Sequence, residues 1–355
     1  MPRRLAKHAF SQAWRLLFFL RQRRAFGEII ARSRRAITPL APLGPVRVVR
    51  SSRLMHKADA VYRREGGGYL LELSRFEALH YADKAGGLGP AYLYWLTQSP
   101  PEVTHISVTL SDGDKSSWAK YAPSSAQPHH VLLPDPYFFI NRAYGWAADY
   151  ARLNEIPWTE RSSDLTWRGA AAGLGTFDPI VGTASPAIAA QRLILCLAAR
   201  NIPDADAALV GYWRDEFRED VLNSYGLLRG PIPEKSWVGR KFAIDVDGQT
   251  NTWTNLLVRL HFGCCVLKVD SRYGFRQWYY DRLVPWEHYV PVKADCSDLA
   301  EQVSWVRDHD REASEIAANG RAIARTLTFE SERAVAVRLI AANWRGDDPY
   351  SPPRL

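Results

Sequence analysis

The order of apolar and polar residues along the chain predicts strands that alternate with helices. In the first half, period-two alternation and turn residues predict four strands and one short helix. The strands are expected at 46–50, 69–73, 104–110 and 131–133, and the helix at 90–96. The second half predicts five strands, at 164–169, 205–210, 241–247, 264–270 and 288–293. It also predicts five helices, at 186–200, 252–262, 297–309, 310–328 and 330–344.

Several of these strands are apolar on both faces, which is typical of parallel sheets covered by helices on both sides. The chain has 355 residues and a mass of 40.2 kDa, more than one ordinary core requires. We therefore expect an α/β chain with two α/β domains joined near residue 160. The expected division is a basic N-terminal arm, two domains, and a C-terminal helix and tail that packs back on the first domain: 1–36, 37–159, 160–329 and 330–355.

Composition excludes several classes of protein. A hydrophobic fraction of 46% and a charged fraction of 24% exclude wholesale disorder. No apolar run approaches the ~18 residues of a membrane-spanning helix. The four cysteines show no CxxC spacing, so we expect neither a zinc site nor a disulfide framework, and we expect a reducing compartment.

Positive charge is concentrated in the arm. Residues 1–36 hold ten basic side chains and one acid, Glu28, whereas the rest of the chain is close to neutral. The basic residues continue through the apolar stretch, unlike in a secretory signal peptide. No nucleic-acid motif follows, so nucleic acid is not an expected partner. Phe10, Trp14, Leu17 and Phe18 beside arginines suit an anionic membrane surface. A disordered arm, or a helix packed on its own domain, remains an alternative.

The segment 245–255 carries the most informative chemistry. A buried strand ends at Asp245 to Asp247, Gly248 allows close backbone approach, and a helix is expected to start near Thr252. Free N–H groups there would favour a phosphate. Thr252 is also a good N-cap, so an ordinary capped helix explains the segment equally well.

Arg168 ends a predicted strand just before the glycine-rich turn 169–175, which places it at the same edge of the sheet. Its guanidinium could donate two hydrogen bonds to a diphosphate, or it could pair with an acid at the surface.

Motifs of other enzyme classes are missing from the sequence. There is no GxGxxG, no Walker lysine and no GxSxG, which argues against dinucleotide enzymes, P-loop ATPases and α/β-hydrolases. The triplets Asp112–Asp114 and Asp245–Asp247 offer two carboxylates each, an incomplete metal shell. The histidines, including His129 and His130, lack a metal-ligand spacing. We therefore expect no metal site.

Four sequence blocks resemble those of glycosyltransferase family 90. Trp158–Arg161 followed by Leu165–Gly169 resembles its W-x-x-K … WRG signature, and Lys241–Gly248 with Trp253 its strand–DG–loop–W block. Trp278–Trp286 with His288–Val292 resembles its L-x-P-W-x-H-Y-x-P block. The helices from Ser297 to Gly320 look like those that close the family's second domain. The resemblance runs from about residue 80 to 345 and is specific in the second half.

This resemblance implies two Rossmann-like domains facing each other across a cleft, the GT-B arrangement. The first domain would lie on the acceptor side and the second would bind a nucleotide sugar. Eight residues take the places of the family's donor-binding groups: Arg168, Gly169, Asp247, Gly248, Trp253, Thr254, Asn255 and Arg259. Animal members carry a second arginine where this chain has Asn255, with Arg259 one turn later, so the contacts to the sugar differ there.

The resemblance also implies an inverting transfer of sugar from a UDP-sugar to a hydroxyl of a cell-surface glycan or a lipid-linked lipopolysaccharide precursor. Asp83 is the nearest match to the family's base, with Asp112 and Asp114 as alternatives. No cofactor and no metal are implied. The expected location is the cytoplasm, peripheral on the inner face of the membrane. A non-catalytic scaffold that binds membrane or nucleic acid through the arm is the alternative from another class.

Overall fold

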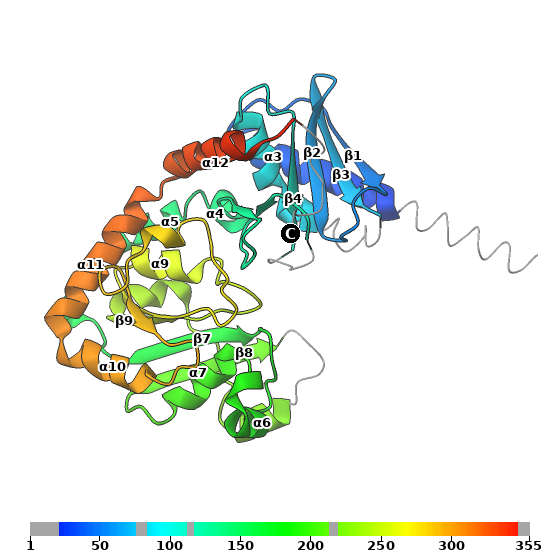
Figure 1. The fold of residues 1–355 in the computed structure, drawn as a ribbon. Helices are drawn as coiled ribbons and strands as arrows, with labels where there is room; N and C mark the ends of the chain where they lie inside the picture. The colour runs from blue at the N-terminus through cyan, green and yellow to red at the C-terminus, as the bar shows by residue number, and fades with distance from the viewer. Residues whose placement is uncertain (1–20, 76–83, 112–116, 213–218, 347–355) are drawn as a thin grey trace, which may run out of the picture. The chain divides into compact units, whose positions relative to one another are not determined.

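The computed structural model describes residues 21–75, 84–111, 117–212 and 219–346, and the chain divides into two compact units. Unit 1 consists of residues 1–123, 127–140 and 333–355, and unit 2 of residues 124–126 and 141–332 (Figure 1). Both units combine helices with sheets that contain parallel strands, so the α/β class is confirmed.

Unit 1 is built on a six-stranded sheet in the order β1-β3-β2-β4-β5-β6. Its strands are β1 (Val46–Ser51), β2 (Asp59–Glu65), β3 (Gly68–Ser74), β4 (His105–Thr109), β5 (Tyr121–Ala122) and β6 (Val131–Leu132). Strand β2 runs antiparallel to both of its neighbours, β3 and β4, and the other pairs are parallel. The expected Rossmann-like first domain is therefore wrong in this respect, because the sheet is mixed.

The antiparallel pair arises from the turn between β2 and β3. Gly66 and Gly67 have φ angles of +55° and +76°, the left-handed region that a tight hairpin turn requires. The sequence pattern did not predict β2, which ends in three charged residues. One of them, Arg64, donates hydrogen bonds to the carbonyls of Leu96 (2.6 Å) and Ser99 (2.7 Å) at the end of α3 (Gly89–Gln98). The charged residue is thus a structural part of the strand.

Unit 1 also contains helical residues 21–37, which include part of the predicted arm. Ile29 and Ile37 on this helix are 1% and 0% exposed. Helix α4 (Pro136–Ile140) and the later part of α12 (Phe329–Asn343) belong to the unit as well. The Tyr121 hydroxyl donates to the Ile340 carbonyl at 3.2 Å, so α12 contacts the sheet.

Unit 2 is built on parallel strands: β7 (Leu165–Ala171), β8 (Ala205–Tyr212), β9 (Phe242–Asp245), β10 (Cys265–Val269) and β11 (Val290–Val292). They form the pair β7-β8 and the trio β11-β10-β9. A parallel bridge between Ser162 and Arg240 places β7 beside β9. The combined order β8-β7-β9-β10-β11 is that of a doubly wound fold, so the predicted parallel sheet of the second half is confirmed.

The helices of unit 2 cover both faces of this sheet, because every residue of β9 and β10 is buried. The α-helices are α5 (Gly145–Leu153), α6 (Pro179–Ala184), α7 (Gln191–Ala199), α8 (Glu219–Ser224), α9 (Asn255–His261), α10 (Leu299–Asp308), α11 (Asp310–Thr326) and the first turn of α12. Short 3-10 helices lie at Trp158–Glu160, Pro186–Ile188, Glu234–Gly239 and Tyr280–Arg282.

Apart from the short segment 124–126, the chain passes from one unit to the other at 140/141 and 332/333, whereas the sequence placed boundaries at 159/160 and 329/330. Helix α5 explains the first difference. Its Trp146 and Tyr150 rings lie 6.1 Å and 6.2 Å from the Phe262 ring at the end of α9, which ties α5 to unit 2. Neither α5 nor α8 was predicted.

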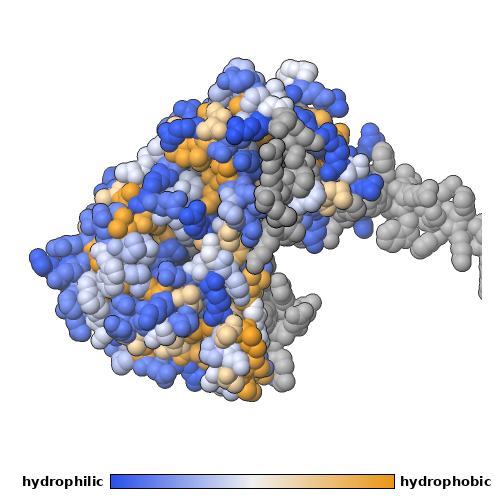
Figure 2. All heavy atoms as spheres, viewed as in Figure 1, coloured by the Kyte–Doolittle hydropathy of each residue, from blue (hydrophilic) through white to orange (hydrophobic). Residues whose placement is uncertain are grey.

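Some large apolar side chains are exposed on the surface of the described residues. Figure 2 shows hydrophobic residues gathered at the edge of the visible face where α6 lies, and Ile180 and Ile188 are 60% and 56% exposed. All four cysteines are buried and form no disulfide. No helix among the described residues is long and apolar enough to span a bilayer.

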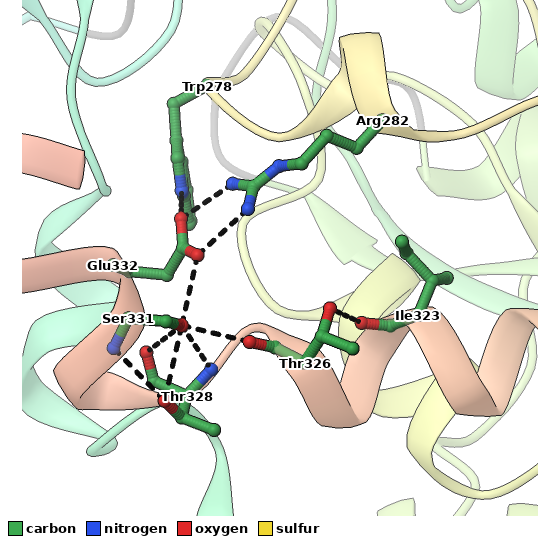
Figure 3. Close-up of polar contacts among 7 residues, drawn as sticks. All are labelled: Trp278, Arg282, Ile323, Thr326, Thr328, Ser331 and Glu332. Atoms are coloured by element: carbon green, nitrogen blue, oxygen red, sulfur yellow. Dashed lines mark hydrogen bonds and ion pairs between the residues drawn. The ribbon is translucent and has the colours of Figure 1, made fainter. Parts of the chain in front are cut away.

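Helix α12 is anchored in unit 2 through a buried carboxylate. Glu332 is 0% exposed and accepts hydrogen bonds from Trp278 Nε1 (2.7 Å) and from both terminal nitrogens of Arg282 (2.9 Å and 2.6 Å), as Figure 3 shows. Thr328 and Ser331 cap the first turn, because each side-chain oxygen accepts from the other residue's backbone N–H at 3.0 Å. The Trp278–Trp286 block thus supplies two partners of Glu332, and Ser331 Oγ donates a further hydrogen bond to it at 3.2 Å.

Replacement of Glu332 by alanine is expected to lower the free energy of unfolding by about 2 kcal/mol, because Arg282 and the Trp278 N–H lose their acceptor. Urea denaturation measures the change. Glu330→Ala, at an exposed acid on the same turn, is the control and should change stability by less than about 0.5 kcal/mol. Equal losses in the two variants would contradict the role given to the buried carboxylate.

Candidate functional site

The first residues of α7 connect the carboxyl ends of four strands in unit 2. Gln191 Nε2 donates to the Asp270 carbonyl after β10 and to the Ala294 carbonyl after β11, both at 2.8 Å. Arg192 donates to carbonyls at the ends of β7 and β9. In doubly wound folds, ligands bind where the strand order reverses, here between β7 and β9. Arg192 is therefore placed at the topological switch point.

Arg192 holds two of these loops together through its guanidinium. Nε donates to the Asp247 carbonyl at 3.2 Å and Nη1 donates to the Ala170 carbonyl at 2.9 Å. Among the described residues, Nη2 has no hydrogen-bond partner. The side chain of Arg192 is partly buried. Burial lowers the pKa of Arg192, and the carboxylates of Asp245 and Asp247 oppose this shift. The guanidinium of Arg192 therefore keeps its positive charge, and its Nη2 is available to donate hydrogen bonds to a ligand.

Gly248 leaves Nη2 of Arg192 accessible, because it has no side chain. A Cβ atom at Gly248 would lie 2.8 Å from Nη2 of Arg192, so a side chain there would press on the guanidinium. Gly173, with φ +152°, approaches the same loop, since its Cβ would lie 3.3 Å from the Gly248 carbonyl oxygen. The two glycine-containing loops predicted from the sequence therefore lie side by side.

Trp167 and Gly169 of the WRG block position Arg192. The Arg192 guanidinium lies 5.7 Å from the centroid of the Trp167 ring, within cation–π range. A Cβ at Gly169 would lie 2.4 Å from the same ring, so only glycine leaves room for it. These two residues shape the floor beneath the guanidinium.

The guanidinium of Arg168 is paired with Asp206 on β8 and with the Gly230 carbonyl. Its nitrogens donate to the Gly230 carbonyl (3.2 Å), to the Asp206 carbonyl (2.7 Å) and to the Asp206 carboxylate. Neighbouring residues of a strand point to opposite faces, so Arg168 and Trp167 cannot both face the site. The arginine that reaches the Gly248 loop is Arg192, which lies in the predicted helix 186–200 and was not a predicted site residue.

Behind the loop, Asp245 organises the end of β9. It is 0% exposed, lies 3.6 Å from Lys268 Nζ on β10, and accepts hydrogen bonds from Thr252 Oγ1 and from Asn255 Nδ2 (2.9 Å). Asn255 also donates to the Ile244 carbonyl at 3.0 Å. Asn255 therefore stabilises the loop from below.

Asp247 is a buried carboxylate in the loop itself, with 5% exposure. Burial raises its pKa to about 6, and the Lys268 cation and hydrogen bonds from Ser271 and Asn251 oppose this rise. Asn251 Nδ2 is 3.4 Å from Asp247 Oδ1, and Asp247 Oδ2 has no hydrogen-bond partner among the described residues. Asp247 is thus brought to the site together with Gly248.

The other predicted donor-binding residues are divided between the loop and the helix behind it. Helix α9 begins at Asn255 rather than near Thr252, and Thr254 occupies its N-cap position without a side-chain capping bond. The Trp253 carbonyl accepts from the Tyr144 hydroxyl at 3.2 Å, which fixes the loop. Arg259 is only 5% exposed and pairs with Glu234 at 2.7 Å, so the structure does not bring its guanidinium to the loop.

The predicted base lies outside the part of the chain that the structure describes. Asp83 and its alternatives Asp112 and Asp114 all fall in the ranges 76–83 and 112–116, for which no placement is given. Within the described residues, no cluster of three histidine, cysteine or acidic side chains could hold a metal ion.

The arrangement can bind an anion at the edge of the sheet. Arg192 offers an open guanidinium nitrogen, Lys268 adds positive charge below it, and the glycines at 173 and 248 keep side chains away. The buried carboxylates of Asp245 and Asp247 offset these cations, and they order the loop. Such a site suits a ligand that brings phosphate oxygens to Arg192 and hydroxyl groups to the carboxylate of Asp247.

The raised pKa of Asp247 predicts how stability depends on pH. Because the folded state binds a proton more tightly than the unfolded state, stability should fall as pH rises from about 4 through about 6. Asp247→Asn should remove this loss, so its unfolding free energy relative to the parent should rise by about 2 kcal/mol between about pH 4.5 and about pH 7.

Denaturation of both proteins at the two pH values measures this difference. Asp149→Asn, at an acid with a side chain 71% exposed, is the control and should show no such rise. A difference that does not change with pH would contradict the assigned pKa.

Comparison with known proteins gives a family match over the same region. The model of glycosyl transferase family 90 matches residues 182–332, which include α7, the Gly248 loop and Glu332. The chain is 36% identical to protein O-glucosyltransferase 2 of Danio rerio over 137 residues, covering 38% of this chain and 26% of that protein. It is 28% identical to protein O-glucosyltransferase 3 of Homo sapiens over 233 residues, covering 56% and 44%.

Another relative is the uncharacterized protein 179R of Invertebrate iridescent virus 6, 28% identical over 224 residues that cover 56% of this chain and 18% of that protein. Each match spans less than half of the relative's length. Solved structures show weak similarity: TarM has a TM-score of 0.36 at 11% identity, covering 53% of this chain and 37% of TarM. Anabaena HepE in complex with UDP-glucose has a TM-score of 0.33 at 13% identity, covering 57% and 53%. The resemblance seen in the sequence is confirmed: residues 182–332 of this chain match the model of glycosyl transferase family 90.

Proposed function

We propose that the chain is an inverting glycosyltransferase, which moves a sugar from a UDP-sugar to a hydroxyl of a cell-surface glycan or a lipopolysaccharide precursor. The observation that carries the proposal is the open Nη2 of Arg192, at the switch point of a parallel sheet and within the region that matches family 90. The proposal includes the GT-B arrangement that the family resemblance implies, with the acceptor held on the side of the first domain.

The chemistry requires a site that binds a diphosphate and stabilises it as it leaves. When the bond from the anomeric carbon to the β-phosphate breaks, negative charge develops on the phosphate oxygens. Arg192 already has two of its nitrogens fixed by carbonyls, so Nη2 is held in place before the reaction begins. A preorganised cation of this kind stabilises developing charge without reorganising.

The names of the relatives suggest which sugar donor to test first. Two of them are protein O-glucosyltransferases, so UDP-glucose is the first donor to test within a panel of UDP-sugars. The carboxylate of Asp247 lies next to Gly248 and is suited to accept a hydrogen bond from a sugar hydroxyl or from the ribose. The proposed donor site thus consists of Arg192, Asp247, Gly248 and the loop to Asn255.

Inversion also requires a base that removes the proton of the acceptor hydroxyl while it attacks the anomeric carbon from the opposite face. Asp83 remains our candidate for the base, with Asp112 and Asp114 as alternatives. The proposal includes no resident metal ion, so transfer is assayed with a chelator present as well as without one.

Replacement of Arg192 by alanine should weaken UDP binding by about tenfold to a hundredfold, because a charge-assisted hydrogen bond to the diphosphate is lost. Isothermal titration calorimetry with UDP measures the affinity. Arg192→Lys keeps the charge and should retain more affinity than Arg192→Ala.

Arg200→Ala is the matched control, since Arg200 is an exposed arginine at the other end of α7 and should leave UDP affinity unchanged. Thermal unfolding of each variant separates loss of binding from loss of fold. If Arg192→Ala bound UDP like the parent and Arg168→Ala lost binding, the site would be wrongly assigned to Arg192.

Replacement of Asp83 by asparagine should leave UDP affinity unchanged and reduce transfer by a factor of about 100 or more, because the acceptor proton has no base. Release of UDP from UDP-sugars in the presence of an acceptor measures transfer. Asp112→Asn and Asp114→Asn are the parallel variants. Full activity of Asp83→Asn with loss in one of the other two would move the base to that residue.

A further inference from the structure

The helix at residues 21–37 presents two different faces. Ile29, Ser33 and Ile37 are 1%, 3% and 0% exposed, and their spacing of four residues places them on one side of the helix. This buried stripe attaches the helix to unit 1. The opposite side is therefore held in a fixed orientation toward solvent, which a disordered arm would not provide.

The solvent side of this helix is strongly basic. The helix carries six arginines and a single acid, Glu28. Five of the arginines are exposed: Arg21, Arg23, Arg24, Arg34 and Arg35. Glu28 accepts hydrogen bonds from Arg32 (2.9 Å) and Arg35 (3.2 Å), and both arginines lower its pKa. The one acid is thus already neutralised by its neighbours, and the helix keeps a net charge of +5.

The two units also differ in net charge, and the positive one is unit 1, which contains this helix. Unit 1 has 24 basic and 12 acidic side chains, a net charge of +12, and unit 2 has 22 and 26, a net charge of −4. The two values add to the +8 of the chain. An anionic surface would therefore attract unit 1 and repel unit 2.

We propose that the exposed arginine face of helix 21–37 is a docking surface for an anionic phospholipid bilayer. Guanidinium groups form paired hydrogen bonds with lipid phosphates, and a row of arginines on one helix face meets many headgroups in one plane. In the sequence just before the helix, Phe10, Trp14, Leu17 and Phe18 are interspersed with basic residues. Aromatic and aliphatic side chains of this kind enter a bilayer interface, which favours lipid over nucleic acid as the partner.

Vesicle co-sedimentation of the full chain tests this docking surface. The parent is mixed with vesicles in which about a third of the phospholipid is anionic, and separately with neutral vesicles. A triple variant, Arg21→Gln, Arg24→Gln and Arg35→Gln, removes charge from the docking face. The matched control is Arg152→Gln, Arg276→Gln and Arg311→Gln, at arginines of unit 2 whose side chains are 64%, 58% and 79% exposed. Circular dichroism checks that both variants fold.

The parent should sediment with anionic vesicles and not with neutral ones, and high salt should release it. The triple variant should lose about tenfold or more in partitioning, whereas the control variant should bind like the parent. The proposal is overturned if the parent does not sediment with anionic vesicles, or if both triple variants lose binding equally. It is also overturned if the same arginines bind duplex nucleic acid more tightly than vesicles.

Discussion

The contact on which the candidate site depends is that of the Arg192 guanidinium with the ends of β7 and β9. Two of its nitrogens bind the Ala170 and Asp247 carbonyls, and the Trp167 ring lies beneath it. Because an arginine cannot easily release its charge, this contact places a permanent cation at the switch point of the sheet. The adjacent glycines at 173 and 248 leave room for a ligand on its open side.

Several residues of the recognisable sequence blocks stabilise the fold around the site. Trp167 and Gly169 form the floor, and Arg161 donates to the Phe262 and Gly263 carbonyls, which closes the end of α9. Trp278 holds Glu332 at the start of α12.

The sequence predicted the parallel strands of the second half and the two glycine loops, because these depend on local apolar runs and on turn residues. It could not predict which arginine faces the site. Arg168 and Arg192 both lie near strand ends, and only the pleat of β7 turns Arg168 toward Asp206. Strand β2 was missed because its charged end is stabilised by distant carbonyls, such as that of Leu96, and not by its own pattern.

A crystal structure of the chain with UDP bound tests the central claim most directly. The account predicts a phosphate oxygen of UDP within hydrogen-bond distance of Nη2 of Arg192, beside Gly248, with Arg168 still paired to Asp206. A diphosphate bound against Arg168 or Arg259, with Arg192 making no contact to it, would contradict the account.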